Sequence, residues 1–356
     1  MQLDHFVTLG RSGLRVSPFA LGTMTFGEDW GWGSSVAESE AILAAYLDRG
    51  GNHIDTANIY TAGHSEKIIG DYLARQPGRR DRLVIGTKFF ANLFAGDPNG
   101  GGAGRKSLIA ALEASLRRLQ TDYIDLYWIH NWDRGTPIEE TLRTLDDLVR
   151  AGKIRYVGFS DLPGWKVGQA QTLATLRGWA PAIAMQLEYS LIERTGEGEL
   201  VPAAQELGLG LMPWSPLKSG WLSGKFSRTS RGDSTRAIGA PTERDWRIID
   251  QVAAVAKQLD TSSAQVAISW VHGRPGVAST LVGARTVAQL NDNLAALTVA
   301  LTPAQRASLD EVSKPTLNFP FDNNAQLGPI LQYAGAHVDG VQTSVMPRLI
   351  EHPTRY

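Results

Sequence analysis

Short apolar runs of strand-like composition alternate with amphipathic runs along this chain, and that alternation constrains its fold more than any other feature. Eight runs predict strands, at 18–22, 51–55, 83–87, 123–129, 154–160, 182–187, 208–214 and 277–284. The runs between and after them predict helices, at 36–49, 65–75, 105–119, 137–151, 164–177, 198–206, 244–259, 262–272 and 286–297. Strands that are apolar on both faces are typical of parallel sheets covered by helices. The repeat therefore predicts an α/β protein with a closed (β/α)8 TIM barrel, and an open doubly wound sheet is the alternative.

Three segments lie outside this repeat. Residues 3–16 predict a hairpin that closes the bottom of the barrel. Residues 89–104 form a glycine-rich loop after the third strand, which we interpret as a mobile active-site loop. The irregular tail at 314–356 is expected to fold over the active face. We expect one domain spanning 1–356, with the barrel core at 17–300.

The composition excludes several classes of protein. The net charge is −1, which gives no reason to expect a nucleic-acid or membrane-surface partner. The chain has no cysteine, so disulfides, thiolate chemistry and cysteine-ligated metals are excluded, and no other cluster of metal ligands is visible. Its start lacks the pattern of a signal peptide, and no window is apolar enough to span a membrane. We therefore expect a soluble, cytoplasmic protein without a metal ion, and the sequence leaves its oligomeric state open.

Several motifs of known chemistry are absent. The run at 99–107 superficially resembles a P-loop, but Arg105 separates the glycines from Lys106, where that motif requires a glycine. No G-x-G-x-x-G follows a predicted strand, so a Rossmann dinucleotide site has no support. The hydrolase signatures G-x-S-x-G and H-E-x-x-H are also missing.

Four ionisable side chains each stand beside a predicted strand: Asp55, Tyr60, Lys88 and His130. The ends of neighbouring parallel strands converge, so we expect these side chains to meet in one cleft. A tyrosine with its usual pKa of about 10 is a weak acid, and an adjacent ammonium lowers that pKa. Asp55 would hold Lys88 in place, and His130 would orient a substrate oxygen or assist proton transfer. Singly, each residue is more simply a cap, a strand end or packing, but together they predict proton transfer to a carbonyl oxygen.

Further short motifs occur in a fixed order, namely LGTM (21–24), GTK (86–88), VGFS (157–160), MQLEYS (185–190), WSPL (214–217) and VGART (282–286). With the four residues above, they make residues 6–310 resemble the aldo-keto reductase superfamily. The resemblance implies a (β/α)8 barrel that binds NADPH in an extended form without a Rossmann domain. It implies Tyr60 as the general acid, Lys88 and Asp55 as the pair that tunes it, and His130 as the orienting residue.

The resemblance also implies a cofactor cleft. Its residues would be Gly22, Thr23, Met24, Asp55, Ser160, Asp161, Gln186, Trp214, Ser215, Pro216, Leu217, Lys218, Gly220, Lys225, Gly283, Arg285, Gln289 and Asn293. Ser160, Asp161 and Gln186 would bind the nicotinamide carboxamide, and Trp214 would stack on the ring. Residues 215–225 would cover the pyrophosphate. Arg285 at a helix start suits a 2′-phosphate and favours NADP over NAD, although a merely exposed arginine would leave that preference open.

One residue departs from the family pattern. Asp161 stands where the family usually has asparagine, which both donates and accepts hydrogen bonds, whereas an ionised aspartate only accepts. Asp161 either contacts the carboxamide or caps the helix that begins near Pro163.

Apolar residues crowd the loops of the expected active face. The candidate substrate residues are Met24, Phe26, Trp30, Ile59, Phe90 and Trp132. Trp30 and Trp32 could equally serve only to pack their loop. No Arg or Lys stands at a clear pocket position, so we expect uncharged, apolar aldehydes or ketones, including bulky xenobiotics. The predicted function is reversible, NADPH-dependent carbonyl reduction. The alternatives are a non-catalytic NADPH-binding regulatory subunit and, with less support, a lyase or isomerase on the same barrel.

Overall fold

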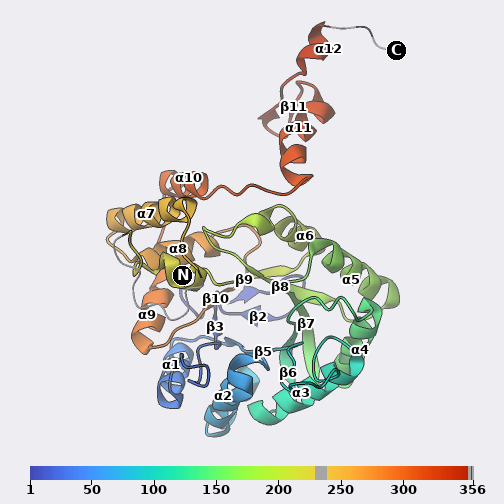
Figure 1. The fold of residues 1–356 in the computed structure, drawn as a ribbon, viewed down its shortest axis with the longest axis vertical. Coiled ribbons are helices and arrows are strands. Elements are labelled where there is room, and N and C mark those ends of the chain that lie inside the picture. Colours follow the sequence, from blue (N-terminus) through green and yellow to red (C-terminus); the bar gives the residue numbers. More distant parts are fainter. Residues whose placement is uncertain (229–238, 352–353, 355–356) are drawn as a thin grey trace.

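The computed structural model describes residues 1–228, 239–351 and 354. Its centre is a parallel eight-stranded sheet in the order β10-β3-β4-β5-β6-β7-β8-β9 (Figure 1). The strands are β3 (Phe19–Gly22), β4 (His53–Asp55), β5 (Val84–Phe89), β6 (Ile124–Ile129), β7 (Ile154–Ser160), β8 (Ala182–Glu188), β9 (Gly210–Trp214) and β10 (Thr280–Val282). The sheet closes where Leu211 in β9 donates to the Gly276 carbonyl at 3.0 Å and accepts from Ala278 at 2.9 Å. The predicted barrel is confirmed, and the open sheet is wrong.

Helices surround the barrel, as Figure 1 shows. They are α1 (Val36–Asp48), α2 (His64–Ala74), α3 (Arg105–Leu119), α4 (Ile138–Arg150), α5 (Gly164–Arg177), α6 (Leu200–Leu207), α7 (Glu243–Gln258), α8 (Ser263–His272), α9 (Val287–Ala295) and α10 (Pro303–Val312). The nine predicted helices are confirmed, with ends within two residues of those expected. Helix α10 is absent from the predicted set, although Thr302 and Gln305 form a capping box around Pro303. No helix in the described part of the chain is long and apolar enough to span a membrane.

The predicted hairpin closes the amino-terminal end of the barrel. Strands β1 (Val7–Thr8) and β2 (Arg15–Val16) pair antiparallel. Leu9 and Val16 are fully buried and pack with Leu126, Trp128 and Met212, which belong to the strands of the barrel. The turn reaches the floor of the barrel at Gly10, where φ is +57° and a Cβ atom would overlap the Ile183 carbonyl oxygen. Glycine suits this position because it adopts positive φ without a steric penalty.

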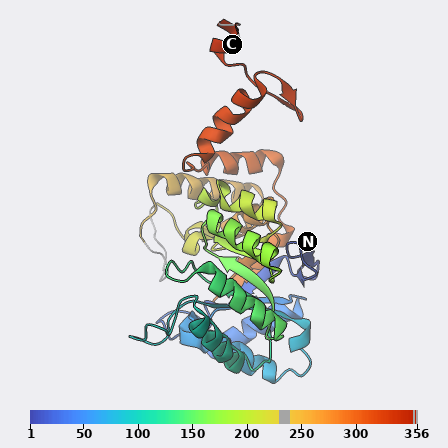
Figure 2. The same cartoon turned by 90° about the vertical axis from the view of Figure 1, so that its right-hand side faces the viewer.

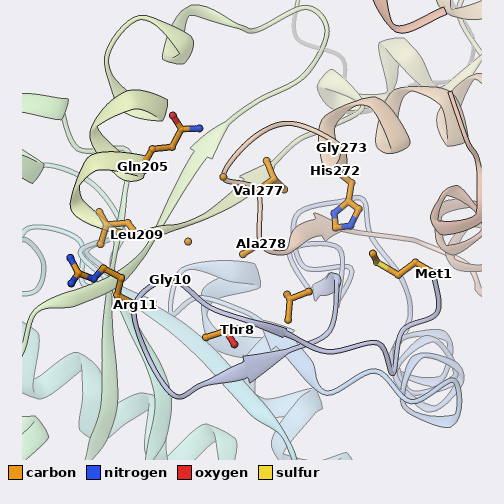
Figure 3. Close-up of a pocket in the computed structure, with 15 residues that line it drawn as sticks. Met1, Thr8, Gly10, Arg11, Gln205, Leu209, His272, Gly273, Val277 and Ala278 are labelled. Atoms are coloured by element: carbon orange, nitrogen blue, oxygen red, sulfur yellow. The ribbon is translucent and has the colours of Figure 1, made fainter. Parts of the chain in front are cut away.

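A cavity of about 690 Å³ lies beside this hairpin, at the end of the barrel remote from the carboxyl ends of the strands (Figure 3). Its wall includes Thr8 and Arg11 from the hairpin, Gln205 from α6, and His272 with Val277 from the segment before β10. The position shows that the hairpin covers the barrel floor without filling all the space around it.

The tail does not lie over the active face. It contains α11 (Phe321–Tyr333), a hairpin of β11 (His337–Val338) and β12 (Val341–Gln342), and α12 (Pro347–Glu351). Figures 1 and 2 show these elements projecting away from the barrel. Neither α11 nor α12 has a buried residue, so little apolar surface holds the tail against the body. The expectation that the tail covers the cleft is therefore wrong for the described residues from α11 to α12, and residues 352, 353, 355 and 356 lie outside the described part of the chain.

Candidate active site

Adjacent strands bring the four predicted catalytic residues together. Asp55 ends β4, Lys88 lies near the end of β5, and His130 directly follows β6. The strands are parallel and paired in register, with Asp55 opposite Gly86 and Lys88 opposite Trp128. Tyr60 begins a short 3-10 turn, η1 (Tyr60–Gly63), after β4. All four therefore reach the carboxyl-terminal end of the barrel.

The ammonium group of Lys88 is the centre of the cluster. It hydrogen-bonds to the Asp55 carboxylate, to the Thr56 carbonyl oxygen at 2.9 Å and to the Tyr60 hydroxyl at 3.4 Å. Both members of the ion pair are buried. The second Asp55 oxygen accepts a hydrogen bond from the Gln186 amide at 2.6 Å. Asp55 is thus held from two sides, and its position fixes that of Lys88.

Burial and neighbouring charges shift the pKa values of Lys88 and Tyr60 in opposite directions. Burial is the largest single effect and disfavours the Lys88 ammonium, but Asp55 and Tyr60 together outweigh it and raise the pKa of Lys88. Burial raises the pKa of Tyr60 above its ordinary value, while Lys88 opposes that rise. The expected influence of Lys88 is present, yet burial exceeds it. The phenol consequently keeps its proton at neutral pH, as a general acid requires.

The His130 ring lies edge-on to Tyr60, with ring centroids 6.1 Å apart and an interplanar angle of 80°. Burial, with a contribution from the Lys88 charge, lowers the pKa of His130 to about 3. The backbone N–H of His130 donates to the Phe89 carbonyl at 3.1 Å, which places the residue at the strand end. The imidazole is therefore neutral at physiological pH and suited to hydrogen bonding and not to acid catalysis.

Asp161 lies between two predicted cofactor residues. One carboxylate oxygen accepts from the Ser160 hydroxyl at 3.1 Å, and the other accepts from the Trp214 indole at 3.1 Å. Burial in the cleft raises the pKa of Asp161 to about 6. Its φ of +56° is a backbone conformation that aspartate and asparagine adopt more readily than most residues. Helix α5 begins after Pro163 without a side-chain cap, so the capping alternative is wrong.

The loop after β9 carries the next predicted cofactor residues. Ser215, Lys218 and Gly220 all have positive φ, and the loop forms the kinked turn η4 (Lys218–Ser223). The Lys218 ammonium pairs with Glu188 at 2.7 Å, so part of its charge is neutralised within the chain. Pro216 is buried and Leu217 half-buried, while Lys225 is exposed. The compact turn presents backbone groups at the active end of the barrel.

The segment before α9 faces the end of β3. A Cβ atom on Gly283 would lie 3.5 Å from the Gly22 carbonyl oxygen, an ordinary contact distance, so the two glycine segments lie side by side here. The Asn293 amide donates to the Gly283 carbonyl at 3.0 Å, and the Gln289 side-chain oxygen accepts from the Arg285 backbone at 2.9 Å. Asn293 and Gln289 therefore hold this segment in shape.

On the opposite side of Gly22, the hydroxyl of Thr23 donates to the Asp55 carbonyl at 3.1 Å. Half-buried Met24 follows it. These contacts tie the start of the cleft to the strand that carries Asp55.

The comparison with known families agrees with this geometry. The model of the Aldo/keto reductase family matches residues 18–314. This chain belongs to the aldo-keto reductase family. Its relatives include the uncharacterized oxidoreductase YrpG of Bacillus subtilis, with 38% identity over 83% of this chain and 92% of the relative. A norsolorinic acid reductase of Aspergillus flavus is 32% identical over 89% of this chain and 83% of its own. A putative aryl-alcohol dehydrogenase of Saccharomyces cerevisiae is 34% identical over 87% of this chain and 86% of its own.

Membership of this family makes the chain an oxidoreductase that acts on small carbonyl compounds with a nicotinamide nucleotide. The residues fit such a cofactor, because the Gly283 segment, the turn of positive φ after β9 and the Trp214 indole all lie at the active end of the barrel. This end holds Asp55, Tyr60, Lys88 and His130, which we call the tetrad. Within the described part of the chain, no three His, Asp or Glu side chains are grouped so that they could hold a metal ion.

The predicted substrate residues of this aldo-keto reductase differ in how far they are exposed. Phe26 is fully buried in the hydrophobic core. Its predicted place in the substrate pocket is therefore wrong, because the side chain has no exposed surface for a substrate to contact. Ile59 is half-buried beside Tyr60. Trp30 is 37% exposed and its ring lies 5.6 Å from that of Trp32, so the two pack together at the surface. This contact agrees with the loop-packing alternative.

Phe90 lines a cavity of about 510 Å³ between the 89–104 loop and the loop after β6. Trp132 contacts Trp165, whose ring lies edge-on to it at 5.4 Å. Trp165 is not among the substrate residues predicted from the sequence. Its signal was a large apolar side chain one helical turn after Asp161. Neither this cavity nor the one beside the hairpin is lined by a tetrad side chain.

Proposed function

We propose that this enzyme uses NADPH to reduce aldehydes or ketones reversibly to alcohols, with Tyr60 as the general acid. The observation that carries the proposal is the hydrogen bond between the buried Lys88 ammonium and the Tyr60 hydroxyl. When bound, the reduced nicotinamide supplies the hydride to the carbonyl carbon. The carbonyl oxygen then needs a proton, and Tyr60 is the protonated donor in the cleft.

Each remaining tetrad residue supports that proton transfer. The positive charge of Lys88 stabilises the phenolate that Tyr60 leaves behind. Asp55 keeps Lys88 charged and in place, since an unpaired ammonium would be costly to bury. His130, which is neutral, donates or accepts a hydrogen bond that orients the carbonyl oxygen beside Tyr60. In the reverse direction the same groups return the proton to Tyr60.

We assign the nicotinamide end of the cofactor to Ser160, Asp161 and Trp214, and the adenosine phosphate to Arg285. The helix start at Thr286 adds the partial positive charge of a helix amino terminus beside the Arg285 guanidinium. Such a pair favours NADP over NAD because only NADP carries the 2′-phosphate. Gln186 is bonded to Asp55, so its contact with the carboxamide requires its remaining amide hydrogen or its oxygen.

The substrate proposed from the sequence is an uncharged, apolar carbonyl compound that can be bulky. Exposed or half-buried apolar side chains near the tetrad, including Ile59 and Trp132, support it. Two relatives are named as a norsolorinic acid reductase and as a putative aryl-alcohol dehydrogenase, and the second name indicates an aromatic compound. These names describe those proteins and serve here only as support.

The test is the consumption of NADPH and of NADH by the purified enzyme with aliphatic and aromatic aldehydes and ketones of graded size. We expect turnover with NADPH at lower cofactor concentration than with NADH, and better catalytic efficiency for large apolar carbonyls than for sugars. Tight NADPH binding without turnover of any carbonyl would instead support a non-catalytic regulatory subunit. The intact tetrad argues against that alternative.

A further inference from the structure

Two tryptophans contact each other at the rim of the active face. Trp132 follows His130 by two residues, and Trp165 lies in the first turn of α5, four residues after Asp161. Their rings meet edge to face at 5.4 Å with an interplanar angle of 89°. Trp165 is 56% exposed. So large an apolar ring left open beside a catalytic cleft is a candidate binding surface, because apolar patches on soluble proteins mark interaction sites.

The two rings are held by charged neighbours. The Arg134 guanidinium carbon lies 4.9 Å from the centroid of Trp132, and the Lys166 ammonium lies 4.6 Å from that of Trp165. Cations at such distances are attracted to the indole face. The backbone N–H of Trp165 also donates to the Glu199 carboxylate at 2.9 Å. The pair is therefore fixed before a ligand arrives, which reduces the entropy lost on binding.

The position of the pair sets the size of a ligand that could reach it. The Tyr60 and His130 rings are 6.1 Å apart. The two-residue step from His130 to Trp132 spans at most about 7 Å along the backbone. The ring centroid of Trp165 lies a further 5.4 Å from that of Trp132. A ligand that reaches Trp165 from Tyr60 therefore passes His130 and Trp132, and we expect two or three fused rings to bridge this path better than a single ring.

We propose that Trp165, together with Trp132, forms a remote specificity subsite that stacks the far ring of a planar, fused aromatic carbonyl substrate. The proposal rests on the reductase function proposed above and narrows its substrate class from apolar to aromatic and polycyclic. Trp165 touches no tetrad residue, so its role is to bind the distant part of the substrate and not to take part in proton transfer.

The experiment compares the wild type with Trp165→Leu, which removes the aromatic face but keeps an apolar side chain. The substrates are benzaldehyde, phenanthrene-2-carbaldehyde and the fully saturated analogue of the latter, which has similar size but no π face. For phenanthrene-2-carbaldehyde we expect KM to rise about three- to tenfold, the range that corresponds to one aromatic stacking contact. KM for the other two substrates and kcat for all three should not change. Trp165→Phe should restore most of the loss.

Several outcomes would overturn the proposal. These are an unchanged KM for phenanthrene-2-carbaldehyde in Trp165→Leu, or an equal rise in KM for the saturated analogue. If the wild type reduces none of these aldehydes, the reductase function fails, and the subsite is tested separately by binding. Calorimetry then measures phenanthrene-2-methanol binding to the enzyme mixed with NADP. Weaker binding in Trp165→Leu supports the subsite, and equal binding contradicts it.

Discussion

The Lys88 ammonium lies 3.4 Å from the Tyr60 hydroxyl and is hydrogen-bonded at the same time to the Asp55 carboxylate. One buried cation thus joins a carboxylate that ends β4 to a phenol in the turn that follows. Burial keeps the phenol protonated, and the cation lowers the energy of its conjugate base. The two effects together make Tyr60 an acid that is loaded at neutral pH and able to give up its proton in the transition state.

Replacing Tyr60 by phenylalanine removes the proton and keeps the ring. We expect kcat to fall by about 10²- to 10⁴-fold, the usual contribution of a positioned general acid. Binding of NADPH, measured by quenching of tryptophan fluorescence, should be unchanged because the ring remains. Turnover near the wild-type rate would show that another group protonates the carbonyl oxygen.

The buried pair of Asp55 and Lys88 predicts a particular pattern of stability. Asp55→Leu or Lys88→Met alone leaves an unpaired buried charge, which typically lowers the free energy of unfolding by about 3–5 kcal/mol. The double variant leaves neither charge, so its loss should be well below the sum of the two single losses. Urea denaturation of the four proteins measures this coupling. Additive losses would mean that the two side chains do not stabilise each other.

Asp161 predicts a pH dependence of cofactor binding. Its pKa is raised to about 6, so the carboxyl is neutral below that pH and negatively charged above it. The oxidised nicotinamide ring is cationic and the reduced ring is neutral. Affinity for NADP⁺ relative to NADPH should therefore rise as the pH increases from 5 to 7. A rise of about fivefold corresponds to about 1 kcal/mol, the attraction of two charges 4 Å apart in water-like surroundings.

The matched variant for this prediction is Asp161→Asn, which keeps the shape and cannot ionise. In this variant, the ratio of the dissociation constants for NADP⁺ and NADPH should not change between pH 5 and 7. Because burial raises the folded pKa of Asp161 from 3.8 to about 6, its contribution to the free energy of unfolding declines as the pH rises between these two values. A pH-dependent ratio that survives in Asp161→Asn would assign the titration to another group.

Arg285 is the residue expected to distinguish the two cofactors. In Arg285→Ala we expect the KM for NADPH to rise about tenfold, equivalent to the loss of about 1.4 kcal/mol, because the 2′-phosphate loses its bidentate partner. The KM for NADH should stay unchanged. Steady-state kinetics with both cofactors provides the measurement, and an equal rise for both would place Arg285 elsewhere on the cofactor.

The hairpin at the barrel floor should matter for stability and not for catalysis. Leu9 is fully buried there, so Leu9→Ala is expected to lower the free energy of unfolding by about 2–5 kcal/mol. Leu176 is 77% exposed, and Leu176→Ala is the matched control with little expected effect. The kcat of both variants should equal that of the wild type. A large fall in kcat for Leu9→Ala would show that the floor is coupled to the tetrad.

The sequence alone determined the barrel, the nine helices of its wall and the location of the tetrad at the strand ends. These follow from local patterns, because hydrophobic periodicity and cap residues act over a few positions. It also located Asp161 as the departure that matters. It missed α10, whose capping box was visible, and it overestimated the contacts of the tail, whose helices α11 and α12 bury no residue against the barrel.

Only the tertiary structure decided what surrounds each of these residues. Phe26 belongs to the core and Trp165 to the rim of the active face, although both are aromatic residues that closely follow predicted cofactor residues in the sequence. The pKa of Tyr60 depends on burial and on Lys88 together, and the size of either effect is set by distances between separate strands. Composition and spacing name the chemical groups, whereas dielectric environment and contact distance, which fix their energies, exist only in the folded chain.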